Sequence, residues 1–129
     1  MKTRYLTSLA ILAGFGMGAL AVQGLHAQAQ KTVLYSVTEI DVKNLDAYLK
    51  EYAPPVTALQ KKFNGRNLTV GGKVTPIEGQ TPKSRVAIIV WDNMAQYQAY
   101  RNSAEWKESR KIGDKYATFR TFAVEGAPQ

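Results

Sequence analysis

The stretch Arg85-Val86-Ala87-Ile88-Ile89-Val90-Trp91 decides how this chain must fold. It is short and rich in β-branched residues, which is typical of a buried strand. Because side chains alternate along a strand, the even-numbered residues face one side of the sheet and the odd-numbered residues face the other. Apart from Arg85, the residues of both sets are apolar. We therefore expect a strand in the middle of a sheet that needs a covering layer on each side.

Three more strands are predicted around this one. Residues 33–40 and 118–124 are rich in β-branched and aromatic types, and residues 66–70 form a shorter strand that ends at Gly71-Gly72. We expect residues 73–77 to extend the pairing of that short strand before the chain turns at residues 78–82.

The first helical region follows the first strand. Asn44 is a suitable cap, and apolar residues recur at spacings of three and four; they are Leu45, Tyr48, Leu49, Tyr52, Val56, Leu59 and Phe63. Pro54-Pro55 lies inside this pattern, so a kink or a two-piece helix is expected. Asn64-Gly65 predicts the end of the helix.

The second helical region lies between residues 93 and 117. Asn93 is expected to cap a helix that carries Met94, Tyr97 and Tyr100 on one face. Ser103 is expected to cap a further helix with Trp106 in its first turn.

The element order is therefore β-α-β-β-α-β, which is the ferredoxin-like α+β arrangement with one antiparallel sheet. Its first and third strands lie in the middle of the sheet. Two helical regions can cover only one face, and the chain has no further element for the other. We therefore predict that a second copy covers it and that the protein is a homodimer.

The N-terminus has the pattern of a secretory signal peptide. Lys2 and Arg4 precede an apolar run at residues 9–22, and Ala27 and Ala29 offer small residues for a peptidase. The alternative, an uncleaved anchor, needs about 20 apolar residues to span a bilayer, more than this run supplies. We expect cleavage after Ala29, export to the periplasm or beyond, and a single domain at residues 30–129 with no membrane contact.

Composition then excludes several kinds of chemistry. The chain has 129 residues, no Cys and one His, and that His26 lies in the leader. A mature chain without His and Cys has no thiolate or imidazole metal ligands, no Cys nucleophile, no His base and no proximal His for haem, so neither metal nor cofactor is predicted. The remaining positive charge is scattered and the tyrosines have helical spacing, which argues against nucleic acid as a partner.

Several short motifs along the chain occur in the order and spacing of a known family. They are Asn44-Leu45-Asp46-Ala47-Tyr48 with Tyr52, Gly71-Gly72, Glu78-Gly79, Ser103-Ala104-Glu105-Trp106 and residues 120–126. The chain resembles the domain-of-unknown-function family 1330 (DUF1330) over nearly all of its mature length. The chain departs from the family pattern at two motifs. Asn44-Leu45 replaces the expected Asp-Pro, and Ser103-Ala104-Glu105-Trp106 replaces the expected Ser-Pro-Glu-Tyr.

The resemblance implies a ferredoxin-like domain that pairs two sheets into a dimeric α+β barrel. That superfamily includes cofactor-free monooxygenases, haem-degrading enzymes, isomerases and proteins without an assigned activity, so the fold alone does not choose a function.

Five residues are candidates for a ligand pocket: Tyr48, Asn67, Glu78, Trp106 and Arg120. Glu78 suits either a turn or a buried general base. Arg120 suits either an anion clamp or an ion pair with Glu39, Glu105 or another acid. Trp106 begins a helix at the edge of the layer, where a pocket mouth would lie.

Three functions remain open from the sequence. The first is an exported homodimeric protein that binds a small apolar or anionic molecule, or an accessory protein. The second is a cofactor-independent enzyme of the monooxygenase or isomerase type, with Arg120 stabilising an oxyanion. The third is a structural or assembly module. A pocket behind Trp106 with Arg120 pointing into it would favour the first two, and a buried acid or base with a shifted pKa would favour the enzyme.

Overall fold

The computed structural model describes residues 31–128, so the predicted leader lies outside the described residues. The elements in chain order are β1 (Leu34–Val42), α2 (Leu45–Ala47), the π-helical turn η1 (Tyr48–Tyr52), α3 (Ala53–Lys62), β2 (Arg66–Val70), β3 (Arg85–Trp91), α4 (Met94–Asn102), α5 (Ala104–Gly113) and β4 (Ala117–Glu125). This is the predicted ferredoxin-like β-α-β-β-α-β order, in which the first helical region comprises α2, η1 and α3 and the second comprises α4 and α5.

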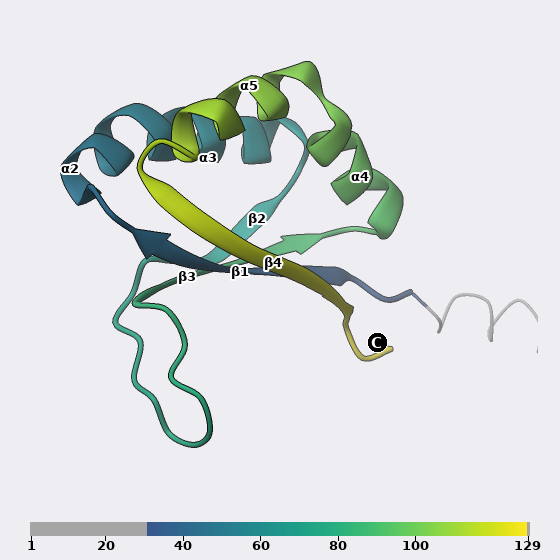
Figure 1. Ribbon diagram of the computed structural model, residues 1–129. Helices are drawn as coiled ribbons and strands as arrows, with labels where there is room; N and C mark the ends of the chain where they lie inside the picture. The colour runs from purple at the N-terminus through teal and green to yellow at the C-terminus, as the bar shows by residue number, and fades with distance from the viewer. Residues whose placement is uncertain (1–30, 129) are drawn as a thin grey trace, which may run out of the picture. The chain divides into compact units, whose positions relative to one another are not determined.

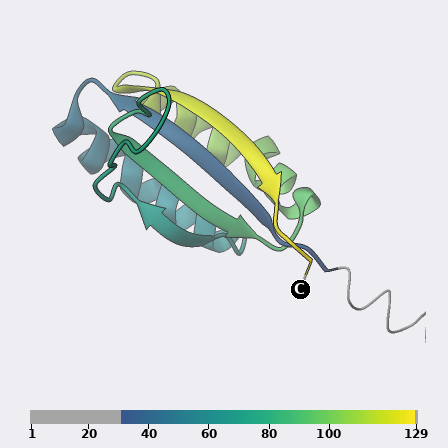
Figure 2. The same ribbon diagram turned by 90° about the horizontal axis from the view of Figure 1, so that it is seen from below.

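The four strands form one antiparallel sheet in the order β2-β3-β1-β4, so β1 and β3 occupy the predicted central positions. All helices lie on the same side of this sheet (Figure 1). Seen from below, the sheet stands in front of the helices and no helix covers its outer face (Figure 2). Within residues 31–128, no helix combines the length and apolar character needed to cross a bilayer.

The core lies between the sheet and the helices and contains Ala87, Ile89 and Trp91, the odd-numbered side chains of β3. Trp91 is fully buried, and its indole Nε1 donates a hydrogen bond to the Ser36 hydroxyl at 2.9 Å. Gly65 lies so close to this indole that a Cβ at this position would come within 2.8 Å of the ring. The end of α3 is thereby fixed against the middle of the sheet.

The first helical region runs without a gap from Leu45 to Lys62 and widens into η1 just before the paired prolines, instead of separating into two helices. The Ala53 N–H bonds to the Tyr48 carbonyl five residues back, which makes the turn before Pro54 a π-helical one. Because proline has no N–H to donate, the wider turn falls where the α-helical ladder would be interrupted. The expectation that all of the apolar residues in this region are buried is wrong in its first turns. Tyr48 is buried against the sheet, whereas Leu45 and Leu49 remain exposed.

The expectation that residues 73–77 extend the pairing is wrong, because residues 71–84 contain no strand. Gly71 has φ +79°, a conformation that redirects the chain. Pro76 and Pro82 have no N–H for a ladder bond. The loop instead lies on the side of the sheet away from the helices (Figure 1), where Lys83 approaches Asp41 to 3.4 Å and Ile77 is exposed.

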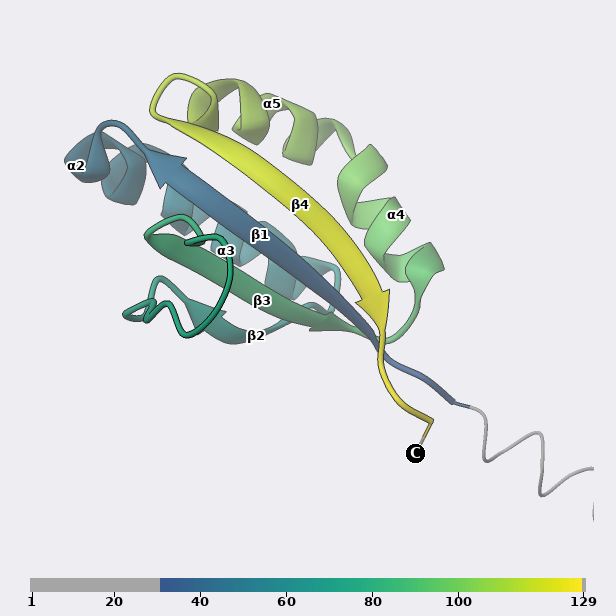
Figure 3. The same cartoon turned by 60° about the horizontal axis from the view of Figure 1, so that its bottom comes forward.

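The outer face of the sheet is largely apolar, as the even-numbered residues of β3 predicted, and the Glu39–Arg120 ion pair lies at one end of it. We call the following side chains the outer face: Tyr35, Val37, Leu68, Val86, Ile88, Val90, Phe122 and Val124. Figure 3 shows the backbone of β1, β3 and β4, which carry most of these side chains, with no helix in front of these strands. Phe122 and Val124 are 46% and 50% exposed, and no segment of residues 31–128 forms a second layer over them.

Candidate functional site

A small cavity lies between the helices and the sheet, next to the core clusters. Its open volume is about 60 Å³. Side chains from β1, η1, α3, α4, α5 and β4 line it, and Ala87 of β3 contributes to its floor. The polar lining consists of hydroxyls, the Gln60 amide and the guanidinium groups of Arg101 and Arg110. No carboxylate lines this cavity, and residues 31–128 contain no cluster of acids, His or Cys suited to a metal ion.

Arg110 of α5 supplies the first cation of the site. Its guanidinium carbon lies 3.7 Å from the centroid of the Phe119 ring and 5.0 Å from that of Trp106. Its Nε atom is buried without a hydrogen-bond partner among the described residues. Aromatic faces can stabilise a guanidinium by cation–π attraction, but they do not satisfy N–H groups that lie in its plane. Arg110 therefore retains an unused donor.

Arg101 of α4 supplies the second cation. Its guanidinium carbon lies 4.1 Å from the Trp106 ring centroid, and its Nη1 donates to the Tyr97 hydroxyl at 3.1 Å. Within residues 31–128, neither Arg101 nor Arg110 forms an ion pair with a carboxylate. The Trp106 ring thus lies near two positive charges that the protein does not neutralise.

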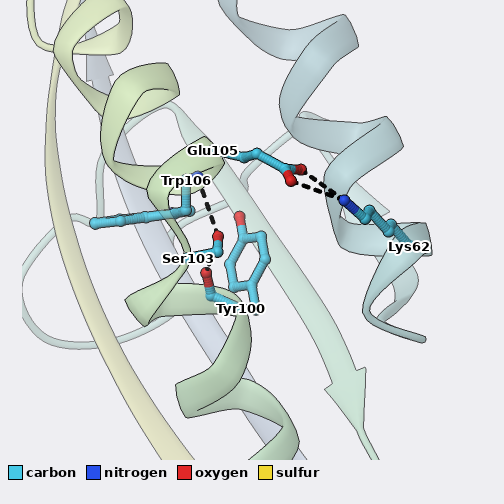
Figure 4. Close-up of polar contacts among 5 residues, drawn as sticks. All are labelled: Lys62, Tyr100, Ser103, Glu105 and Trp106. Atoms are coloured by element: carbon cyan, nitrogen blue, oxygen red, sulfur yellow. Dashed lines mark hydrogen bonds and ion pairs between the residues drawn. The ribbon is translucent and has the colours of Figure 1, made fainter.

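The α4–α5 junction fixes the position of Trp106. The Ser103 hydroxyl accepts a hydrogen bond from the Trp106 N–H at 3.1 Å and donates one to the Tyr100 carbonyl at 2.7 Å. Glu105, the preceding residue, pairs with Lys62 of α3 at 2.8 Å. Trp106 and Glu105 point to opposite sides of α5, so the cap and the ion pair hold the helix start from both directions (Figure 4).

Three buried tyrosines, Tyr48, Tyr52 and Tyr100, line the cavity together with Arg110. Burial raises the pKa of Tyr48, Tyr52 and Tyr100 above the ordinary value. The rise in pKa is opposed chiefly by Arg85 at Tyr48, by Arg110 at Tyr52 and by a hydrogen bond with Gln60 at Tyr100, and the charge of Arg110 also opposes it at Tyr48 and Tyr100. The phenols are therefore protonated at neutral pH, and they present O–H donors rather than bases.

These raised pKa values predict a loss of stability at high pH. Tyrosines in the unfolded chain ionise near pH 10, before the buried ones, so unfolding releases protons above that pH. The contribution of these groups to the free energy of unfolding is complete below about pH 10 and falls as the pH rises further. We expect urea unfolding at about pH 8 and about pH 11 to show this decrease, and Tyr100→Phe to reduce it. Equal pH dependence in Tyr100→Phe and the wild type would contradict this assignment.

The structure brings together only two of the five sequence-predicted site residues, Tyr48 and Trp106, which both line the cavity. Asn67 lies on β2, where its Oδ1 atom is buried without a partner. Glu78 is exposed in the loop between β2 and β3. Arg120 lies opposite Glu39 in the β1–β4 register and pairs with it at 2.5 Å on the outer side of the sheet. It does not point into the cavity behind Trp106.

Sequence reasoning missed the two arginines that do line the cavity. Arg110 stands next to Lys111 near a helix C-terminus, where basic residues are usually solvated. One signal was present, because Arg110 follows Trp106 by four residues and so shares its helix face. Charged side chains are seldom buried without a partner, so an arginine on the apolar face of a helix indicates a functional or structural role for its charge.

Comparison with protein families tests the resemblance found in the sequence. A family model described as "Domain of unknown function (DUF1330)" matches residues 33–127. The chain belongs to this family. A search of curated proteins finds no match to this DUF1330 protein.

Solved structures share the fold of this DUF1330 chain at low sequence identity. A protein of unknown function from Rhodopseudomonas palustris has a TM-score of 0.63 at 11% identity, covering 84% of this chain and 93% of its own. A dimeric protein of unknown function with a ferredoxin-like fold from Bacteroides fragilis has a TM-score of 0.51 at 13% identity, covering 73% and 96%. SnoaB from Streptomyces nogalater, a cofactor-independent oxygenase, has a TM-score of 0.54 at 13% identity, covering 76% and 95%. At such identities the likeness shows the fold.

Proposed function

We propose that this DUF1330 protein is an exported homodimer that binds a small molecule in the cavity beneath its helices. The observation that carries the proposal is the buried Arg110 Nε without a partner, at a cavity that no carboxylate lines. A buried donor left unpaired costs free energy, and a bound acceptor would remove that cost. Enclosed apolar walls with a few converging polar groups are typical of small-molecule sites.

The homodimer is supported by the apolar outer face. Ile88 lies at its centre, opposite Val37 in β1 and Thr69 in β2. An exposed apolar surface that spans four strands is a liability in a monomer and is typical of a protein–protein interface. A second copy would supply a matching face, and the dimeric Bacteroides protein shows that this fold is compatible with pairing. The cavity lies on the opposite side of the sheet, so each copy would keep its own site.

Export is supported by the N-terminal pattern alone. The basic start, the apolar run at residues 9–22 and the small residues Ala27 and Ala29 are together typical of a cleavable leader.

A cofactor-independent enzyme is the second candidate. The Arg110 guanidinium and the surrounding phenols are donors that could stabilise an oxyanion. A general base is missing from the cavity lining, because its tyrosines have raised pKa values and no carboxylate lines it. This lack of a base favours binding over catalysis.

Native mass spectrometry of the protein purified from the exported fraction tests the proposal. We expect an added small-molecule mass that is released on denaturation. Ala87→Val adds two methyl groups at the cavity floor and should abolish the added mass. Ala99→Val makes the same chemical change on the exposed side of α4 and should retain it. An adduct that persists in Ala87→Val, or a wild-type protein that never carries one, would contradict the proposed site.

A further inference from the structure

The charge balance of the cavity identifies the class of its ligand. Arg101 and Arg110 both line it, and none of its lining residues is Asp or Glu. Burying a cation is costly unless an anion or a set of hydrogen-bond acceptors accompanies it. The Arg101 guanidinium lies over the face of the Trp106 ring, 4.1 Å from its centroid. The Arg110 guanidinium lies over the face of the Phe119 ring, 3.7 Å from its centroid. The Nε–H of Arg110 is buried and has no acceptor among the described residues.

The neutral donors around Arg110 favour an acceptor with two oxygen atoms. Tyr48, Tyr52 and Tyr100 line the same cavity, and Arg110 lowers the pKa of each phenol against the effect of burial. The guanidinium therefore lies within electrostatic reach of all three hydroxyl groups. A carboxylate can accept a hydrogen bond from a guanidinium and from a phenol at the same time. Aromatic walls beside the arginines suit the carbon skeleton of such an acid.

The volume restricts the size of the ligand. A water-sized group needs about 10–15 Å³ of open cavity volume, so about 60 Å³ has room for roughly four to six non-hydrogen atoms, and acetate and propionate have four and five. Such a volume holds a carboxylic acid of two or three carbon atoms.

From these three observations we infer that the ligand is a small monocarboxylate whose carboxylate group pairs with Arg110 beside Trp106. This inference rests on the proposed function and specifies the ligand class of the same site. Arg110 is the principal contact, Arg101 contributes the second positive charge, and the tyrosine hydroxyls supply neutral donors.

A comparison of propionate with propionamide tests the inference on the wild-type protein. The two molecules have nearly the same shape and differ in charge. We expect sodium propionate to raise the thermal unfolding midpoint and to change the tryptophan fluorescence saturably, with an affinity at least about tenfold higher than that of propionamide. Sodium chloride at equal concentration measures the effect of an inorganic anion and is expected to have no saturable effect.

Variants assign the effect to the cavity. Arg110→Gln should reduce the affinity for propionate about tenfold or more and leave propionamide unaffected. Arg110→Lys keeps the charge but loses the planar donor pair, so it should give an intermediate affinity. Lys107→Gln removes the same unit of charge from the exposed side of α5 and should bind propionate like the wild type.

Each opposite result overturns the inference in a recognisable way. Equal affinity for propionamide would show that the site does not select charge, while the proposed small-molecule function would stand. Equal effects of chloride and propionate would assign the site to inorganic anions. An equal loss in Lys107→Gln and Arg110→Gln would indicate a general charge effect. If neither organic probe binds, the carboxylate inference fails, and the native mass spectrum separately decides the proposed function.

Discussion

Ile88→Glu is expected to convert the protein from a dimer into folded monomers. Ile88 lies at the centre of the outer face, so the new carboxylate would be stranded in a dry interface in the dimer but solvated in the monomer. Pairing of two such faces buries several hundred Å² per chain, which at about 25 cal/mol per Å² gives a gross gain on the order of 10 kcal/mol before the entropy of association is subtracted. Sedimentation velocity at about 100 micromolar measures the result.

The adjacent residue provides the control for this substitution. Ile89 faces the helices and belongs to the core cluster with Trp91. Ile89→Glu should therefore unfold the chain rather than dissociate it, and circular dichroism separates the two outcomes. A wild-type protein that sediments as a monomer, or an Ile88→Glu variant that remains a dimer, would contradict pairing through the outer face.

Trp91→Ala is expected to produce the largest loss of stability. The side chain is fully buried and packs against Tyr97 and Tyr100, with ring centroids 5.3 Å and 4.8 Å away. Truncation leaves a large cavity and removes the hydrogen bond to Ser36, at a cost of about 3–5 kcal/mol. A domain of this size has a total stability of about 5–15 kcal/mol, so the variant should be near the limit of folding.

Urea unfolding of Trp91→Ala and Trp91→Phe separates packing from hydrogen bonding. The phenylalanine variant keeps an aromatic ring and loses the indole N–H, so it should lose less stability than the alanine variant. If Trp91→Ala cost less than about 1 kcal/mol, Trp91 would not be the centre of the core.

The fold was largely predictable because its signals are local. Asn44, Asn93 and Ser103 each cap a helix through a side-chain oxygen, as their positions in the sequence indicated. The apolar pattern of residues 85–91 identified a central strand. The exception was the segment at residues 73–77, whose apolar content favoured a strand while Gly71 and two prolines prevented pairing.

The site was predictable only in part because it depends on long-range register. Tyr48 and Trp106 could be assigned to the helix–sheet layer from helical spacing. Arg120 could not be assigned to a face, because shifting a strand by one residue exchanges its inner and outer side chains. Arg110 carries a charge next to Lys111, and only the packing of α5 on the sheet shows that its guanidinium is enclosed.

An NMR titration that follows the Arg110 Nε–H resonance is the most direct test of the ligand site. With ¹⁵N-labelled protein and sodium propionate, we expect this resonance and the Trp106 indole N–H to shift saturably and together. Arg120, which pairs with Glu39 on the outer side of the sheet, serves as the internal reference and should not shift. Saturable shifts confined to Arg120 or to other surface arginines, with Arg110 and Trp106 unchanged, would contradict a ligand site beneath the helices.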